Sequence, residues 1–125
     1  MVSTLTSTIL LIEDEYNLRQ SLQLIFQHAG YLVKTLQVCP DVSETPVETA
    51  CRLVILSLYK SGHCEIEQIA KVRSCFPNTP ILVLAASETR SLEQASKGKD
   101  VFYLAKPVDP KEILASINDI LNGHR

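Results

Sequence analysis

Charged and hydroxyl side chains stand at or just after the C-terminal ends of three apolar segments of this sequence. Glu13 and Asp14 directly follow one such segment, Ser57 lies near the end of a second, and Lys106 follows a third. Clustered carboxylates and an ammonium group suit ionic chemistry, either an ion pair or the binding of a hard cation. A serine hydroxyl is a weak nucleophile unless a base activates it. These residue types therefore point to an ionic site with a neutral group at one of its positions.

The segment that decides where this site lies is residues 53–58, an apolar run with β-branched members that is followed at once by turn-prone residues. Such a run predicts a buried parallel strand whose C-terminal end opens into a loop. In open α/β sheets, ligand sites lie outside the carboxyl ends of the strands. Ser57 is therefore expected to belong to the site.

The other segments predict alternating strands and helices. Apolar runs predict further strands over residues 8–12, 31–36, 81–85 and 101–104. Apolar residues at helical spacing predict one helix that carries Leu18 to Ala29 and another that carries Ile66 to Phe76. A last helix is predicted with Asp109 as N-cap, Pro110 as its first residue and apolar positions up to Leu121. Two prolines leave only a short or distorted helix over 41–51, and a short helix is expected between Ser87 and Gly98.

This alternation predicts a flavodoxin-like (βα)5 fold, in which a doubly wound, five-stranded parallel sheet lies between two layers of helices. Its first and third strands are expected to be central neighbours, which would bring Glu13 and Asp14 close to Ser57, with Lys106 arriving from the fifth strand. The sequence contains no internal repeat or low-complexity linker. A single domain over residues 1–125, with its core from about 8 to 121, is expected.

Composition excludes several classes of function. Hydrophobic residues make up 46% of the 125 residues and charged residues 21%, and the formal net charge is −2. This charge leaves no basic field for a nucleic-acid backbone, so direct nucleic-acid binding is not expected. The four cysteines form no CxxC pair, no apolar run reaches membrane-spanning length, and no secretory leader is visible. A cytoplasmic location is expected.

Four segments of the chain follow a known pattern in register over about residues 8–121. They are residues 11–15, residues 53–58 with Gly62, residues 80–86 and residues 103–107. In these segments the chain resembles the receiver domain of two-component response regulators, and as a set the motifs are specific to that family. The resemblance implies that Glu13 and Asp14 occupy the acidic pair that holds magnesium. It also implies that Lys106 is the phosphate-contacting lysine and Tyr103 the aromatic switch residue.

The sequence departs from the receiver pattern at two positions. Ser57 stands where the family has its phosphoacceptor aspartate, and Ala85 stands where it has its switch threonine or serine. Receiver phosphorylation needs a carboxylate that attacks phosphorus and also coordinates the metal. Alanine cannot donate the hydrogen bond by which a switch hydroxyl reads the phosphoryl group. The two departures predict a pseudo-receiver that is not phosphorylated and is not an enzyme.

No cofactor is expected to be required. Glu13 and Asp14 could still hold Mg²⁺ weakly, or Lys106 could neutralise one carboxylate without metal. The expected partners are signalling proteins, such as a histidine kinase or another regulator, or a C-terminal output domain. The expected partner surface, which could also form a homodimer, comprises residues 90–97, Tyr103 and the exposed side of 111–121.

Two other functions are open to test. One is an active, magnesium-dependent receiver that accepts phosphate from a histidine kinase at a non-standard residue. The other is a flavodoxin-like cofactor binder, which the sequence disfavours because the acidic turn over residues 13–15 would repel a phosphate group.

Overall fold

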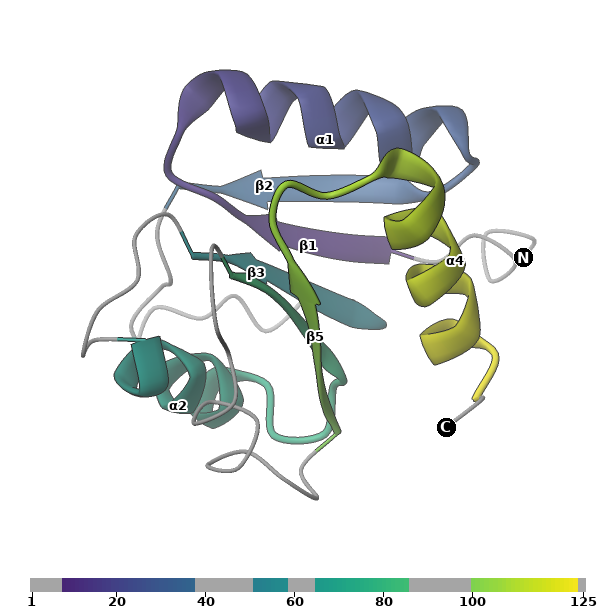
Figure 1. The fold of residues 1–125 in the computed structure, drawn as a ribbon. Coiled ribbons are helices and arrows are strands. Elements are labelled where there is room, and N and C mark those ends of the chain that lie inside the picture. The colour runs from purple at the N-terminus through teal and green to yellow at the C-terminus, as the bar shows by residue number, and fades with distance from the viewer. Residues whose placement is uncertain (1–7, 38–50, 59–64, 86–99, 124–125) are drawn as a thin grey trace.

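The computed structural model describes residues 8–37, 51–58, 65–85 and 100–123. Within these ranges the chain forms one five-stranded sheet and three helices (Figure 1). The strands are β1 (Thr8–Ile12), β2 (Leu32–Leu36), β3 (Leu53–Ser57), β4 (Ile81–Ala85) and β5 (Val101–Ala105). The helices are α1 (Tyr16–His28), α2 (Glu65–Cys75) and α4 (Pro110–Leu121).

The strands are ordered β2-β1-β3-β4-β5, and every neighbouring pair is parallel. β1 and β3 are adjacent, and Ile12 pairs with Leu56 at the end of their ladder. The predicted doubly wound, flavodoxin-like sheet is therefore confirmed. β3 and β4 are buried along their whole lengths, as their uninterrupted apolar sequences predict for strands covered on both faces.

Side chains from alternate strand positions build two cores, one on each face of the sheet. On one face, α1 and α4 contribute Leu22, Phe26, Ile113 and Ile117. On the other face, α2 contributes Ile69, Val72 and Phe76, the last of these just beyond its C-terminal end. Figure 1 shows α1 and α4 on one side of the sheet and α2 on the opposite side. The helices thus form two layers around the sheet, as expected.

Side-chain caps fix where α1 and α4 begin. Asp109 has the extended backbone of an N-cap, and its carboxylate accepts a hydrogen bond from Lys111 N, which confirms the cap predicted for the last helix. α1 begins at Tyr16, two residues before Leu18, the first apolar position of the predicted helix, because Glu15 caps it by accepting hydrogen bonds from two backbone amides.

The predicted helices over residues 41–51 and 87–98 fall on residues outside the described ranges, apart from Cys51. β3 ends at Ser57 rather than at residue 58, although Leu58 remains buried and its amide donates to Leu84 O at 2.8 Å. None of the helices in the described ranges combines the length and the apolar character needed to cross a bilayer.

Candidate functional site

The carboxyl ends of the strands gather five of the side chains singled out by the sequence. We call this group, Glu13, Asp14, Ser57, Ala85 and Lys106, the carboxyl-end site. Glu13 and Ser57 each follow the paired residues Ile12 and Leu56, so they are neighbours at the end of the β1–β3 ladder. Glu13 is fully buried and Ser57 is 6% exposed, whereas Asp14 is exposed.

Hydrogen bonds to both the backbone and the side chain of Glu13 hold it in place. Its amide donates to Leu36 O at 3.0 Å, which extends the contact between β1 and β2 by one residue. Its carbonyl accepts from Arg19 Nη1 at 2.8 Å, and its carboxylate Oε2 accepts from Glu15 N at 2.8 Å. The two backbone bonds fix the position of Glu13 at the end of β1, and the third holds its carboxylate inside the protein.

Lys106 connects the end of β5 with the two central strands. Its ammonium nitrogen Nζ donates to Leu58 O at 2.9 Å and lies 3.8 Å from Glu13 Oε1. Its backbone amide donates to Ala85 O at 2.8 Å. The Lys106 side chain is 16% exposed, so its charge is largely removed from water and is partly balanced by the buried carboxylate.

Two buried oxygen atoms of the site accept or donate no hydrogen bond within the described residues. They are Glu13 Oε1 and Ser57 Oγ. Because no base among the described residues accepts a hydrogen bond from Ser57 Oγ, the serine hydroxyl lacks the activation that a nucleophile requires.

The residues present do not fit a magnesium site well. Mg²⁺ prefers near-octahedral oxygen coordination and is usually bound through carboxylates. The site offers the buried carboxylate of Glu13, the exposed carboxylate of Asp14 and the neutral hydroxyl of Ser57, with an ammonium group 3.8 Å from Glu13 Oε1. Among the described residues, no group of three or more His, Cys, Asp and Glu side chains could hold a metal ion.

The two positions that the resemblance assigns to switching lie on β4, which neighbours β3, and on β5, which neighbours β4. Ala85, at the end of β4, is 2% exposed and packs in the core on the α2 face. Tyr103, in the middle of β5, pairs with Val83 and packs half-buried against the same core. Tyr103 therefore contributes to the packing at the edge of the sheet.

Three features of the site were missed by the reasoning from sequence. Glu15 caps α1, Arg19 holds the carbonyl of Glu13, and the carbonyl of Leu58 accepts from Lys106. The position of Glu15 directly before a helical pattern is a signal that could have indicated the cap. Every residue type has a backbone carbonyl, so nothing in the sequence could indicate that the carbonyl of Leu58 accepts a hydrogen bond from Lys106.

Known proteins are similar to this chain in sequence and in fold. Its sequence is 33% identical over 115 residues to the response regulator ArlR of Staphylococcus aureus, covering 90% of this chain and 52% of ArlR. It is 28% identical over 116 residues to the transcriptional regulatory protein YkoG of Bacillus subtilis, covering 90% of this chain and 50% of YkoG. No family model matches the chain.

The solved structure of chemotaxis protein CheY4 from Vibrio cholerae superimposes with a TM-score of 0.73 at 24% identity. The match covers 92% of this chain and 98% of CheY4. The chain therefore has the fold of CheY4, and over most of its length its sequence is similar to those of response regulators. The chain spans about half the length of the curated relatives that it matches.

Proposed function

We propose that this chain is a receiver domain that signals through protein contacts without being phosphorylated. The observation that carries the proposal is the buried hydroxyl of Ser57 at the strand end where the family has its acceptor aspartate. A carboxylate forms an acyl phosphate by attacking phosphorus directly. Ser57 would need a base for the same attack, and its Oγ has no hydrogen-bond partner within the described part of the chain.

Lys106 supports the same proposal because it supplies a positive charge next to Glu13. With the ammonium 3.8 Å from Glu13 Oε1, one carboxylate of the acidic pair is already partly neutralised. The exposed Asp14 is then the one remaining carboxylate of the pair, and a single exposed carboxylate binds Mg²⁺ weakly. In this proposal the ion pair takes over the charge balance that a divalent metal provides in a phosphorylated receiver.

Ala85 supports the loss of switching. Its methyl group is packed in the core and has no hydroxyl that could move toward a phosphoryl group. Tyr103 would then keep its packed position whatever happens at the carboxyl-end site. We infer that this domain holds one conformation in which its surface is constantly available to partners.

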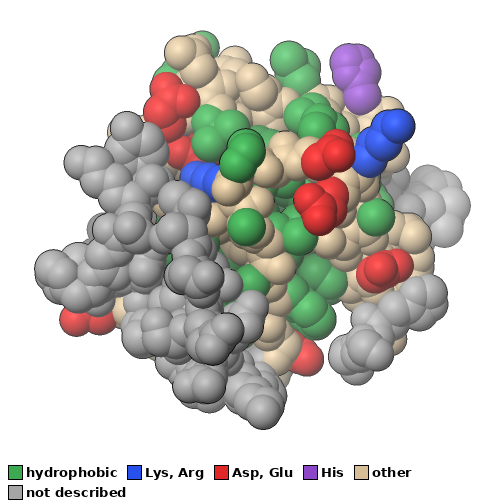
Figure 2. Space-filling model, viewed as in Figure 1, with side chains coloured by type: hydrophobic (Ala, Val, Ile, Leu, Met, Phe, Trp, Pro, Cys, Tyr) green, Lys and Arg blue, Asp and Glu red, His purple; other side chains and the backbone are tan. Residues whose placement is uncertain are grey.

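The partners are proposed to be cytoplasmic signalling proteins, such as a histidine kinase or another regulator, or an output domain on the same chain. Figure 2 shows exposed hydrophobic side chains between acidic ones on the face that carries β5 and α4. Partly exposed apolar residues of these elements and their connection include Phe102, Leu104, Val108 and Leu114. An apolar centre with a charged margin is a common composition for a protein interface. Residues 90–97 of the predicted surface lie outside the described ranges.

The test is to incubate the protein with acetyl phosphate and Mg²⁺ and to measure its intact mass. The proposal expects no stoichiometric gain of a phosphoryl group. A gain of one phosphoryl group on the wild-type chain would overturn it and would favour the alternative of an active receiver with a non-standard acceptor.

The matched variant for this experiment is Ser57→Asp, which restores a carboxylate at the strand end without changing any other part of the site. We expect this variant to acquire a phosphoryl group under the same conditions. A positive result with the variant shows that the assay detects acyl phosphate, which makes the negative result with the wild-type protein informative.

A further inference from the structure

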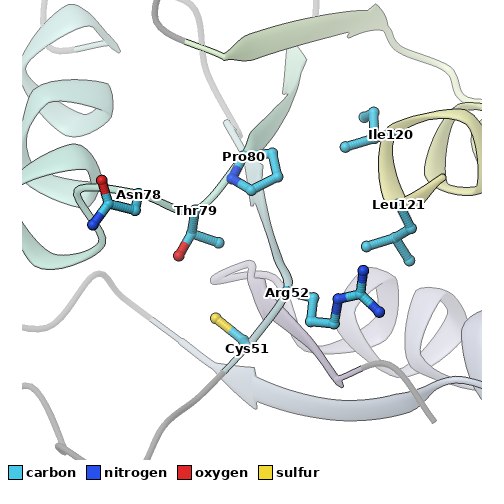
Figure 3. Close-up of a pocket in the computed structure, with 7 residues that line it drawn as sticks. All are labelled: Cys51, Arg52, Asn78, Thr79, Pro80, Ile120 and Leu121. Atoms are coloured by element: carbon cyan, nitrogen blue, oxygen red, sulfur yellow. The ribbon is translucent and has the colours of Figure 1, made fainter. Parts of the chain in front are cut away.

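A cavity of about 260 Å³ lies at the amino ends of β3 and β4. We call it the amino-end cavity. Cys51 and Arg52, directly before β3, line one side of it, and Pro80, directly before β4, lines its centre (Figure 3). Ile120 and Leu121, from the last turn of α4, line another side, across Pro80 from Asn78 and Thr79. Because each central strand has five residues, this cavity lies about 16 Å from the carboxyl-end site.

The lining of the amino-end cavity combines one positive charge with apolar and neutral polar groups. Arg52 is its charged side chain, and Figure 3 shows the guanidinium extending toward Leu121. Arg52 already interacts within the protein, and a guanidinium carries five N–H donors with which it can bind more than one acceptor. Burial raises the pKa of the Cys51 thiol, so this group stays neutral at pH 7. The seven lining residues therefore include one cation and no carboxylate.

The floor of the cavity is built rigidly. Arg73, in the last turn of α2, donates through Nη1 to the carbonyl oxygens of Phe76, Pro77 and Thr79, at 2.9, 3.1 and 2.8 Å. These bonds fasten the connection between α2 and β4, which includes Thr79 and Pro80 of the cavity lining. A preformed wall reduces the entropic cost of binding a small molecule.

We propose that the amino-end cavity binds a small monocarboxylate with a short, branched apolar tail. The carboxylate would accept hydrogen bonds from Arg52, in the planar geometry that a guanidinium favours. The tail would contact Pro80, Ile120 and Leu121. The volume is below the range of drug-sized ligand sites, which limits the ligand to a small metabolite. This inference does not depend on the proposed function, because no residue is shared between the two sites.

The experiment is a titration of the 125-residue chain with isovalerate, followed through backbone amide signals in NMR spectra. We expect saturable shifts at Cys51, Arg52, Asn78, Thr79 and Leu121. The neutral analogue isovaleramide should bind about tenfold more weakly, because it lacks the charge-assisted hydrogen bonds to the guanidinium.

Two variants and one control test whether isovalerate binds in the amino-end cavity. Arg52→Gln should weaken isovalerate binding about tenfold and abolish the preference for isovalerate over isovaleramide. Leu121→Ala should weaken both compounds together, because it removes contact with the tail. Lys111→Gln is the control, since it removes an exposed positive charge from α4 outside the cavity and should leave binding unchanged.

A second readout is the rate at which iodoacetamide alkylates Cys51, measured peptide by peptide with mass spectrometry. Isovalerate should slow alkylation of Cys51 and leave Cys75 unaffected, because Cys75 does not line the cavity. The absence of saturable shifts in the wild-type protein would overturn the proposal. Equal affinity of the wild-type protein for isovalerate and isovaleramide would overturn it too, and neither result requires a variant to fold.

Discussion

Glu13 and Lys106 place opposite charges close together in a part of the protein that is mostly closed to water. A buried carboxylate without a partner is strongly unfavourable, and removing one member of a buried pair usually costs more than the pair contributes. Glu13 is fully buried and Lys106 is 16% exposed, so the cost of leaving Glu13 alone should exceed that of leaving Lys106 alone. This asymmetry can be measured.

We predict that Lys106→Met lowers the free energy of unfolding by about 3 kcal/mol, because it leaves the carboxylate of Glu13 buried without a nearby cation. The double variant Lys106→Met/Glu13→Gln should recover part of this loss. Urea denaturation of the four members of this cycle measures the coupling, with Lys111→Met as an exposed-lysine control. A loss that is the same with and without Glu13 would contradict an electrostatic role for Lys106.

Ser57→Asp is predicted to change how stability depends on magnesium. The added carboxylate would lie beside buried Glu13 on the neighbouring strand, and two like charges there repel each other. The variant should melt at a lower temperature than the wild-type protein in EDTA and should be stabilised by Mg²⁺. Thermal melts with and without Mg²⁺ test this, and Ser57→Asn is the uncharged control. A wild-type melting temperature that rises with Mg²⁺ as steeply as that of the variant would refute the prediction.

The thiol of Cys51 is predicted to react slowly at neutral pH. Burial makes the thiolate less favourable and raises the pKa, and the hydrogen bonds and the nearby Lys34 that lower it have smaller effects. Since the thiolate is the reactive form, a raised pKa means less thiolate at any given pH. Iodoacetamide labelling across a pH series should show the rate at Cys51 rising at higher pH than that of an unstructured peptide with the same sequence. A curve that coincides with that of the peptide would show that burial does not control this thiol.

At the scale of single elements, α1 and α4 both begin with an acidic N-cap, but the two caps lie in different environments. Glu15 caps α1 and its amide also donates to Glu13, so this cap is hydrogen-bonded to the carboxyl-end site. Asp109 caps α4 and is exposed, so its effect on stability comes from the helix alone. Substitution of Asp109 therefore measures how much a capping carboxylate alone contributes to the free energy of unfolding.

We predict that Asp109→Ala lowers the free energy of unfolding by about 1 kcal/mol, because the amide of Lys111 loses its acceptor. Asp109→Asn should cost only a small part of this, since asparagine also caps helices well. Urea denaturation of both variants provides the measurement. An equal loss in the alanine and asparagine variants would mean that the negative charge, rather than the hydrogen bond, stabilises the start of α4.

The elements themselves were largely predictable, because each strand is a short apolar run and each described helix has apolar residues at helical spacing. β3 and β4 are examples, since their five-residue sequences are buried throughout. Contacts between distant segments were not predictable in the same way. The hydrogen bond from Lys106 to Leu58 joins residues 48 apart in the sequence, and its acceptor is a main-chain atom that every residue type offers.

At the scale of the whole molecule, the parallel sheet explains why a site could be predicted at all. Parallel strands bring all their carboxyl ends to one edge, so Glu13, Ser57 and Lys106 had to gather once the strand order was known. The amino-end cavity was not predicted. Its lining comes from residues that precede β3 and β4 and from the last turn of α4, and no sequence motif marks these positions as a site.

The same topology yields a prediction about communication across the sheet. In the wild-type protein, Mg²⁺ with beryllium fluoride, a phosphoryl mimic, should leave the amide NMR signals of β5 and α4 unchanged, because the carboxyl-end site lacks both an acceptor carboxylate and a switch hydroxyl. The variant Ser57→Asp/Ala85→Thr restores both groups and should show shifts that reach Tyr103. Shifts at Tyr103 in the wild-type protein would contradict the proposed single conformation.

The ammonium group beside Glu13 is covalently part of the protein, so it has no dissociation constant and no concentration on which its occupancy could depend. Chelators, dilution and changes in the supply of ions leave it where it is. Each protein molecule contains this positive charge from its synthesis until its degradation. The amount of protein made, rather than the occupancy of its site, would then be the quantity that a cell adjusts.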